Sequence, residues 1–469
     1  MPDRRDHVDA WLGERIEPLP PPPGTFDLIR RRARRRKYRK VAITATSAAA
    51  LVAAAVTVPQ VVNLPVLHPN PTAAPLAGGT QSFSSAAAAA PSQHPSRPAP
   101  STAASSAVPL VDPVPADFRP TSVTFVGKDT GWVIGQAGRP GHCASAYCTS
   151  VARTDDAGQT WTGVPAPVTG RPDGGTGVSQ IRFLDTRNGW AYGPALYATR
   201  TGGRTWTPVD THGLRVTDLE TVGDRVFALW ASCSGHGPTY AVDCTSYTLY
   251  STPADGGGWA PVGGATTGLT NGNASEGASL VLTGTRGYLL GPGGGLYAGP
   301  VDGSAAWQRV SSLIAPCAPG PARANGQPTG ALLAAANARH LVLACASSST
   351  GSNPSESAQQ KLIFSSPNGG TSWLSMATAP AAGVAFSVAA SPSHSIVLGT
   401  DQGIDLLPQG ETTWQTATLK AAAPTGGFGY VGMTTDEQGV ALPADPSAGA
   451  VWFTFDGGQS WKASRLNSP

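Results

Sequence analysis

The eight residues that decide the fold read Thr154-Asp155-Asp156-Ala157-Gly158-Gln159-Thr160-Trp161, and the pattern returns as Thr454-Phe455-Asp456-Gly457-Gly458-Gln459-Ser460-Trp461. Each copy follows a short apolar run and places a carboxylate, a glycine and a tryptophan at fixed offsets. A short carboxylate caps backbone N–H groups of a tight turn, glycine permits a positive φ, and tryptophan buries a large ring. The stretch therefore predicts a turn between two strands, and its recurrence predicts a repeat fold.

Tryptophans close comparable turns along the rest of the chain, at Trp161, Trp206, Trp259, Trp307, Trp373, Trp414 and Trp461. Neighbouring members lie 41 to 66 residues apart, which is the length of four short strands with their loops. Asp302 keeps the carboxylate spacing before Trp307, and Asn368 takes its place before Trp373. With 57 Gly, 43 Pro and only 13% charged residues, the chain suits many short strands and tight turns.

We therefore predict an all-β fold for residues 118–469, a seven-bladed β-propeller of four-stranded antiparallel blades. Residues 461–466 are expected to supply the outer strand of their own blade. The turn resembles the Asp-box, or bacterial neuraminidase repeat (BNR), of sialidase-like propellers, whose pattern is Ser/Thr-x-Asp-x-Gly-x-Thr/Ser-Trp. Residues 120–465 also resemble the propeller of photosystem II assembly and stability factors, because strand two opens with Gly-Trp at 131–132 and 189–190.

This resemblance implies a structural role for the turn residues, namely Asp156, Trp161, Trp206, Asp302, Trp307, Trp373, Asp456 and Trp461. It is specific for the fold and implies little about activity, because propellers with this turn serve many roles. The Asp-boxes are therefore expected to be folding motifs, and the functional residues to lie elsewhere in the domain.

The N-terminal 40 residues are strongly basic. They hold 12 of the 32 Lys/Arg and 6 of the 29 Asp/Glu, so the rest of the chain is mildly acidic despite a net charge of +3. The basic run 30–40 leads into residues 41–58, which are uncharged and rich in Ala and Val. Such a run forms a helix about 27 Å long, close to the hydrocarbon thickness of a bilayer.

By the positive-inside rule, residues 1–40 are predicted to be a cytoplasmic tail and residues 41–64 a transmembrane signal-anchor helix of type II, which places the C-terminal domain outside the cell membrane. A cleavable signal peptide, with a site at residues 53–55, stays open as an alternative. So does a nucleic-acid-binding basic tail, although the acidic remainder argues against nucleic acid as a partner of the domain. Residues 65–117, dominated by Ala, Pro, Ser and Thr, predict a disordered linker that acts as a stalk.

Six cysteines follow residue 140 as three close pairs, Cys143/Cys148, Cys233/Cys244 and Cys317/Cys345. An even count in an extracytoplasmic chain predicts three disulfides. Pairing of near neighbours closes the smallest loops, but the sequence does not fix the connectivity. No CxxC occurs and the eight histidines are scattered, so neither a metal site nor any cofactor is predicted.

The two ends of the predicted disc differ. In an antiparallel blade, the strand 1–2 and 3–4 turns, which include the Asp-boxes, lie at one end, here named the Asp-box end. The strand 2–3 loops and blade connections lie at the other, here named the insertion end. The long insertions 136–150, 232–246 and 346–360 all belong to the insertion end, which is typical of a binding surface, although tolerated insertions also accumulate in loops.

Arg182, Asp218 and Glu220 are the candidate binding residues, on first strands that line the central channel away from the Asp-boxes; a simpler interpretation has them facing trapped water. The preferred function is a membrane-anchored, non-enzymatic binding or assembly module for an extracytoplasmic protein or an envelope glycan. Oligomeric state is left open.

A sialidase-like glycoside hydrolase is the alternative, because sialidases carry the Asp-box and use an arginine cluster, a Tyr–Glu pair and an acidic proton donor. Phe118-Arg119-Pro120 matches the Phe-Arg-Ile-Pro signature of such domains only in part. Possible members of the set are Arg182, Arg215, Arg286, Arg339, Tyr288 and Tyr430, but their sequence context does not assemble them into a site. No GxSxG, Walker loop or HExxH occurs, and no catalytic residue is assigned.

Overall fold

The structure is a computed structural model, and all the residues that it describes belong to one compact unit, Thr102–Pro469. The described residues are 113–137, 149–170, 177–234, 243–264, 278–291, 294–312, 317, 331–346, 361–380 and 383–466. Within these ranges no helix is long and apolar enough to cross a membrane. The predicted tail, span and most of the linker lie outside the described residues and stay predictions.

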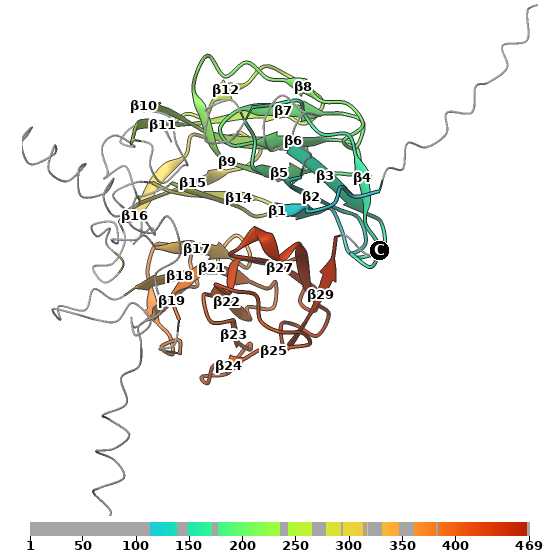
Figure 1. Ribbon diagram of the computed structural model, residues 1–469. Helices are drawn as coiled ribbons and strands as arrows, with labels where there is room; N and C mark the ends of the chain where they lie inside the picture. The colour runs from blue at the N-terminus through green and yellow to red at the C-terminus, as the bar shows by residue number, and fades with distance from the viewer. Residues whose placement is uncertain are drawn as a thin grey trace, which may run out of the picture. The chain divides into compact units, whose positions relative to one another are not determined.

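Seven antiparallel sheets follow one another in chain order, as the blue-to-red colouring of Figure 1 shows. Blades one to three consist of β1 (Arg119–Phe125), β2 (Gly131–Gln136), β3 (Thr149–Thr154) and β4 (Thr162–Val164); β5 (Gln180–Phe183), β6 (Gly189–Tyr192), β7 (Leu196–Thr199) and β8 (Thr207–Pro208); and β9 (Arg215–Val222), β10 (Arg225–Ser234), β11 (Asp243–Pro253) and β12 (Ala260–Pro261).

Blades four to six consist of β13 (Ser279–Leu282), β14 (Arg286–Leu290), β15 (Gly295–Pro300) and β16 (Gln308–Ser312); β17 (Leu332–Ala335), β18 (Leu341–Ala346), β19 (Lys361–Ser366) and β20 (Leu374–Ser375); and β21 (Ala385–Ala390), β22 (Ile396–Thr400), β23 (Ile404–Leu407) and β24 (Gln415–Thr416). Blade seven consists of β26 (Phe428–Met433), β27 (Gly439–Pro443), β28 (Ala450–Thr454) and β29 (Ser460–Arg465), with the short 3-10 helix η6 (Pro446–Ala448) before β28. The predicted seven-bladed, all-β architecture is confirmed.

The hydrophobic core consists of separate layers between neighbouring blades. One cluster joins Phe227 of blade three to Trp307 of blade four, and another joins Val133 of blade one to Phe453 of blade seven. Comparable clusters fill the other blade interfaces. Burial of apolar surface on both faces of every sheet is thus the main stabilising contribution, roughly 25 cal/mol for each Å² removed from water.

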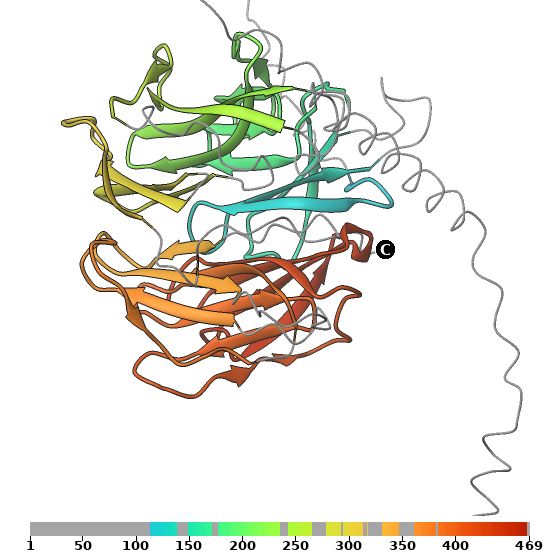
Figure 2. The ribbon, with the colours of Figure 1, turned by 90° about the vertical axis from the view of Figure 1, so that its left-hand side faces the viewer.

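The ring closes through side chains, without exchange of a strand between the first and last blades. β29 pairs with β28, so residues 461–466 do supply the outer strand of their own blade. Figure 2 shows β1 in cyan beside the red strands of blade seven, and β1 contacts β27 and β28. Across this seam the Trp161 indole N–H donates to the Ser464 hydroxyl (3.1 Å), and the Gln438 amide donates to the Lys128 carbonyl (2.6 Å).

Blade seven differs from the expected four strands. A short segment of the connection from blade six, β25 (Thr418–Leu419), pairs in parallel with β29 and makes a fifth strand. It occupies backbone groups on the outer edge of the last sheet, where an unpaired strand would be open to other chains.

The turns of blades one and seven use the hydrogen bonds expected from the repeated motif. In blade one, Asp156 accepts the Thr160 backbone N–H (2.9 Å), and Gly158, at φ +81°, donates to the Thr154 hydroxyl (2.9 Å). Burial opposes the charge of Asp156, but hydrogen bonds from Thr160 and Thr154 lower the pKa of its carboxyl. Asp456 repeats the arrangement in blade seven, accepting the Ser460 N–H (2.9 Å).

Other blades keep the geometry with different chemistry. Thr201 accepts the Thr205 N–H (2.9 Å) in blade two, and Asn368 accepts the Ser372 N–H (2.9 Å) in blade five. In blade four, Asp302 instead caps Ser304 (2.8 Å), two residues on, so its turn is different. The turn tryptophans pack as expected: Trp307 and Trp461 are fully buried, whereas Trp161, Trp206 and Trp373 are half-buried.

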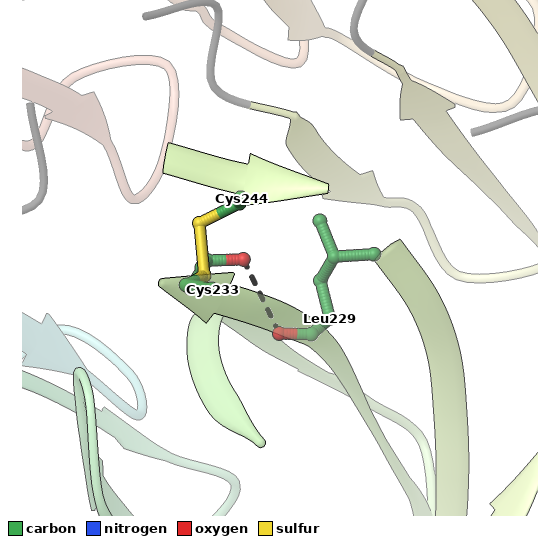
Figure 3. Close-up of a disulfide and its surroundings, with 4 residues drawn as sticks. Leu229, Cys233 and Cys244 are labelled. Carbon is green, nitrogen blue, oxygen red and sulfur yellow. Dashed lines mark hydrogen bonds between the residues drawn. A yellow bond between two sulfur atoms is a disulfide. The ribbon is translucent and has the colours of Figure 1, made fainter. Parts of the chain in front are cut away.

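Two disulfides are present among the described residues, Cys233–Cys244 and Cys317–Cys345. Both follow the near-neighbour pairing expected from the sequence. Figure 3 shows the first, which joins residues that face each other on β10 and β11 at the base of a strand 2–3 insertion. Cys143 and Cys148 lie outside the described residues.

A first prediction concerns the turn carboxylate. Asp156→Ala removes the acceptor of the Thr160 N–H and should lower the free energy of unfolding by about 1–2 kcal/mol. Asp155→Ala is the matched control. The neighbouring Asp155 is exposed and makes only surface contacts, an ion pair with Arg153 and a hydrogen bond from the Thr130 hydroxyl, so its loss should change stability by less than about 0.5 kcal/mol. Urea denaturation of both variants measures the difference; equal effects would contradict a capping role.

Candidate functional site

The innermost strands of the blades can be compared position by position through their pairing with strand two. In every blade one apolar residue pairs with the middle of that strand: Val123, Ile181, Leu219, Leu280, Leu333, Val388 and Val431. The preceding residues form the first channel set, which is Ser122, Gln180, Asp218, Ser279, Leu332, Ser387 and Tyr430. The following residues form the second channel set, which is Thr124, Arg182, Glu220, Val281, Ala334, Ala389 and Gly432.

A β-bulge precedes the first channel set in several blades. The pairing register shifts just before Ser122, Asp218, Ser387 and Tyr430. A bulge bends its strand and re-aims the next side chain. The re-aimed residue ties its blade to the next one: the hydroxyls of Ser122 and Ser387 accept the N–H groups of Ile181 and Val431, both at 3.2 Å.

Asp218 makes the same tie in blade three. One carboxylate oxygen, Oδ2, accepts the Leu280 N–H of blade four (2.8 Å), and Oδ1 accepts the N–H of Leu219 (2.9 Å). The aspartate therefore occupies a position at which blades one and six carry serine.

All the charged residues of the two channel sets lie together in blades two and three. Arg182 donates from Nε (3.0 Å) and Nη2 (2.7 Å) to the same oxygen of Glu220, Oε1. Burial is the largest single influence on Arg182 and disfavours its cation, but the charge and hydrogen bonds of Glu220, together with Tyr192 and Tyr430, raise the pKa of the guanidinium. Asp218 lies on β9 two residues before Glu220, so the cluster contains two carboxylates and one guanidinium.

Two cavities meet at this cluster. The larger, of about 490 Å³, runs along the innermost strands of blades two to seven and is lined by Arg182, Asp218 and Glu220 together with apolar residues such as Leu332 and Val388. The smaller, of about 300 Å³, lies where the innermost strands of blades one, two and seven begin, which is the insertion end. Arg182 and Tyr430 line both cavities, whereas Asp218 and Glu220 line the larger one. Of the predicted binding residues, Arg182 therefore lies next to the cavity at the insertion end.

The ionisation of Asp218 is unusual. Burial is the largest cause, and together with the neighbouring charge of Glu220 it raises the pKa of Asp218 from 3.8 to about 7. Hydrogen bonds from Leu280 and Leu219 and the charge of Arg182 reduce the shift without cancelling it. Near neutral pH the channel therefore exchanges a proton readily, and its net charge lies between zero and −1.

The sequence missed one member of the cluster. Tyr430, considered only as an isolated sialidase-type tyrosine, lies in the first channel set of blade seven and lines both cavities with Arg182. Burial raises the pKa of its hydroxyl, while the charge of Arg182 opposes the shift. Only the closure of the ring brings blade seven against blade one and next to blade two, and no local pattern marks that proximity.

The other sialidase-type residues are not brought together. Arg215 begins β9 at the insertion end, whereas Arg286 begins β14 and Arg339 lies in the β17–β18 turn, both at the Asp-box end. Tyr288 is fully buried and donates its hydroxyl to the Ala338 carbonyl (2.6 Å), a structural contact. Within the described ranges, no group of three or more His, Cys, Asp or Glu side chains is arranged to hold a metal ion.

No family model matches this chain, and no curated protein matches it. Among solved structures, it is similar to YCF48 bound to a D1 peptide, with 17% identity, a TM-score of 0.40 and coverage of 61% of this chain and 79% of that chain. YCF48 from Cyanidioschyzon merolae has 15% identity, a TM-score of 0.39 and coverage of 62% and 85%. An ancestral GH74 enzyme has 13% identity, a TM-score of 0.46 and coverage of 76% and 47%. At these identities the likeness concerns the fold.

A second prediction follows from the raised pKa of Asp218. The pKa of Asp218 in the folded protein, about 7, lies above its ordinary value of 3.8. Ionisation of this carboxyl therefore lowers the free energy of unfolding, increasingly so as pH rises from about 4 to 7. Asp218→Ser keeps a hydroxyl for the Leu280 N–H, as Ser122 does in blade one, and removes the charge. The free energy of unfolding should rise by about 1–2 kcal/mol at pH 8 and by less at pH 5.

Urea denaturation at both pH values measures this effect. Asp210→Ser is the control, because Asp210 is an exposed carboxylate and its loss should change stability little at either pH. A loss of stability in Asp218→Ser at pH 8, or an equal gain at both pH values, would show that the carboxylate is not strained by burial.

Proposed function

We propose that this protein is a non-enzymatic recognition module, tethered to the membrane, that binds an extracytoplasmic protein or an envelope glycan through its insertion end. The observation that carries the proposal is the pair of cavities that meet at Arg182 and Tyr430, one of which lies at the insertion end. Cavities of 300 to 490 Å³ fall within the range of small-ligand and side-chain pockets.

The loops support the same end. β2, β10 and β18 each end where a long insertion begins, and β3, β11 and β19 begin where it ends, so all three insertions leave the disc at the insertion end. The Cys233–Cys244 disulfide closes one of them at its base. A covalent closure reduces the entropy that a loop loses on binding, which favours a loop surface used for recognition.

Charge argues against the sialidase-like alternative. A sialidase must hold the carboxylate of its substrate, but the arginine in this channel is already paired with Glu220 and lies near Asp218. With a net charge between zero and −1 near neutral pH, the cluster offers a substrate anion no net attraction. Hydrolysis of a fluorogenic sialoside by the full chain would favour the alternative; we expect none.

The cellular address is part of the proposal. It rests on the basic run 30–40, the apolar run 41–58 and the Ala/Pro/Ser/Thr-rich stalk. Disulfides in the propeller agree with an oxidising compartment.

A third prediction tests the anchor. The full chain should stay in the membrane pellet after alkaline carbonate extraction, and protease added outside spheroplasts should digest the propeller but spare an epitope at the N-terminus. Deletion of residues 41–64 should release the protein into the soluble fraction. Release of the full chain by carbonate would contradict a spanning helix, and a shortened mature chain lacking residues 1–55 would show signal cleavage instead.

A fourth prediction tests the binding end. The tagged full chain should capture its partner from the envelope fraction, and shortening of the insertions 138–148, 235–242 and 347–360 to Gly-Ser turns should reduce capture at least tenfold. Phe455→Ser is the control: Phe455 is 56% exposed on the Asp-box turn of blade seven, at the opposite end. Undiminished capture by the shortened chain, or loss in Phe455→Ser alone, would assign recognition to another surface.

A further inference from the structure

The fold does not require a negative charge at Asp218. Its structural task is to accept an N–H group from the next blade, and Ser122 and Ser387 perform that task with a neutral hydroxyl. An ionised carboxylate is costly to bury, and Asp218 has no cation in direct contact among the described residues. The charge at this position therefore needs an explanation other than the joining of blades.

Glu220 has unused capacity on the same side of the channel. Its counterpart in blade one is Thr124, so the fold does not require a charge here either. Both donations from Arg182 go to Oε1, and Oε2 accepts no hydrogen bond in the part of the chain that the structure describes. Glu220 and Asp218 both line the cavity of about 490 Å³.

The opposite wall of the cavity is largely aliphatic, although Ser279 and Ser387 also line it. It is formed by the innermost strands of blades four to seven, with Val281, Leu332, Ala334 and Ala389 of the channel sets among the lining residues. A cavity of this size exceeds the needs of a single small ion. Its occupant should therefore combine a cationic group, which faces blade three, with an apolar stem, which lies against blades four to six.

We propose that the channel binds an alkylammonium group, held by the carboxylates of Asp218 and Glu220, with its carbon chain against the apolar wall. A lysine side chain of a partner polypeptide and a free aliphatic amine both present this chemistry. Arg182 and Tyr430 are positioning residues, since Arg182 fixes the Glu220 carboxylate and leaves Oε2 toward the ligand. The inference deepens the proposed function and rests on it for the idea that the channel is a recognition site.

Proton linkage adds a signature that a structural role would not produce. The groups that face Asp218 are Glu220, Arg182 and the Leu280 and Leu219 N–H groups, with Tyr192 and Tyr430 nearby in the cluster. Because the pKa of Asp218 is about 7, part of the population carries a proton that the cation must displace. Affinity should therefore increase between pH 6 and pH 8, by up to about tenfold.

A fifth prediction states the binding experiment, which uses the full chain in detergent and isothermal titration calorimetry. The probes are n-pentylamine, n-pentanol and two peptides of identical sequence that carry either one lysine or norleucine at the same place. We expect the amine to bind and the alcohol not to. Binding of the lysine peptide in preference to its norleucine twin would identify a polypeptide as the source of the cation, and binding of the free amine alone would identify a small amine.

Asp218→Ser should weaken amine binding at least tenfold and remove its pH dependence, while preserving the tie to Leu280. Asp210→Ser removes the same charge from an exposed site and should leave affinity within twofold. Unchanged binding in Asp218→Ser, or equal binding of pentanol and pentylamine, would overturn the proposal. If the amine fails to bind while the shortened insertions abolish partner capture, the channel inference is wrong and the proposed function stands. If the amine binds while the shortened chain still captures its partner, the channel binds amines and the assignment of recognition to the insertion end is wrong.

Discussion

Each blade of this protein is a thin sheet whose two faces are both apolar, and neither face can be left in water. A single blade has no interior of its own, because the core clusters lie between blades rather than within them. A row of such sheets would leave two faces exposed at its ends, whereas a ring gives every sheet two neighbours. Closure is therefore the condition on which the stability of every blade depends.

The seam between blades one and seven meets this condition with side-chain packing and side-chain hydrogen bonds, without a shared strand. The Ser464 hydroxyl donates to the Gly158 carbonyl and accepts the Trp161 indole N–H, so the turn at residues 154–161 of blade one is held by the last strand. Phe125 and Phe453 pack edge to face across the same interface, with ring centroids 5.7 Å apart. The repeated turn thus serves the ring as well as its own hairpin, which is why its residues belong to the scaffold.

A ring of seven sheets leaves a channel at its axis, and what lines that channel is not needed to bury the blades. Most positions of the two channel sets are small, neutral or apolar, and the charges are confined to Arg182, Asp218 and Glu220 in adjacent blades. This asymmetry is the feature that the repeat does not explain. The charged cluster lies between a largely aliphatic wall and a cavity at the insertion end, and this position is the reason for assigning recognition to the channel.

The repeat pattern was sufficient to predict the architecture, because the interactions that define a blade are local. Asp156 caps a residue only four positions away, and strand pairing follows chain order. The same locality predicted the two observed cysteine pairs and identified Arg182, Asp218 and Glu220 as residues of first strands. Local patterns did not predict three features, namely the fifth strand of blade seven, the different turn at Asp302, and the proximity of Tyr430 to Arg182 across the seam.

Whether Asp218 is paired, buried or open to a cavity was likewise decided only by tertiary structure. Its partner N–H comes from Leu280, 62 positions further along the chain, and its charge is set by burial and by Glu220 together. A repeat in the sequence determines the turns and strand pairing within each blade. The ring determines what faces the axis, because that environment is the sum of contributions from all the blades.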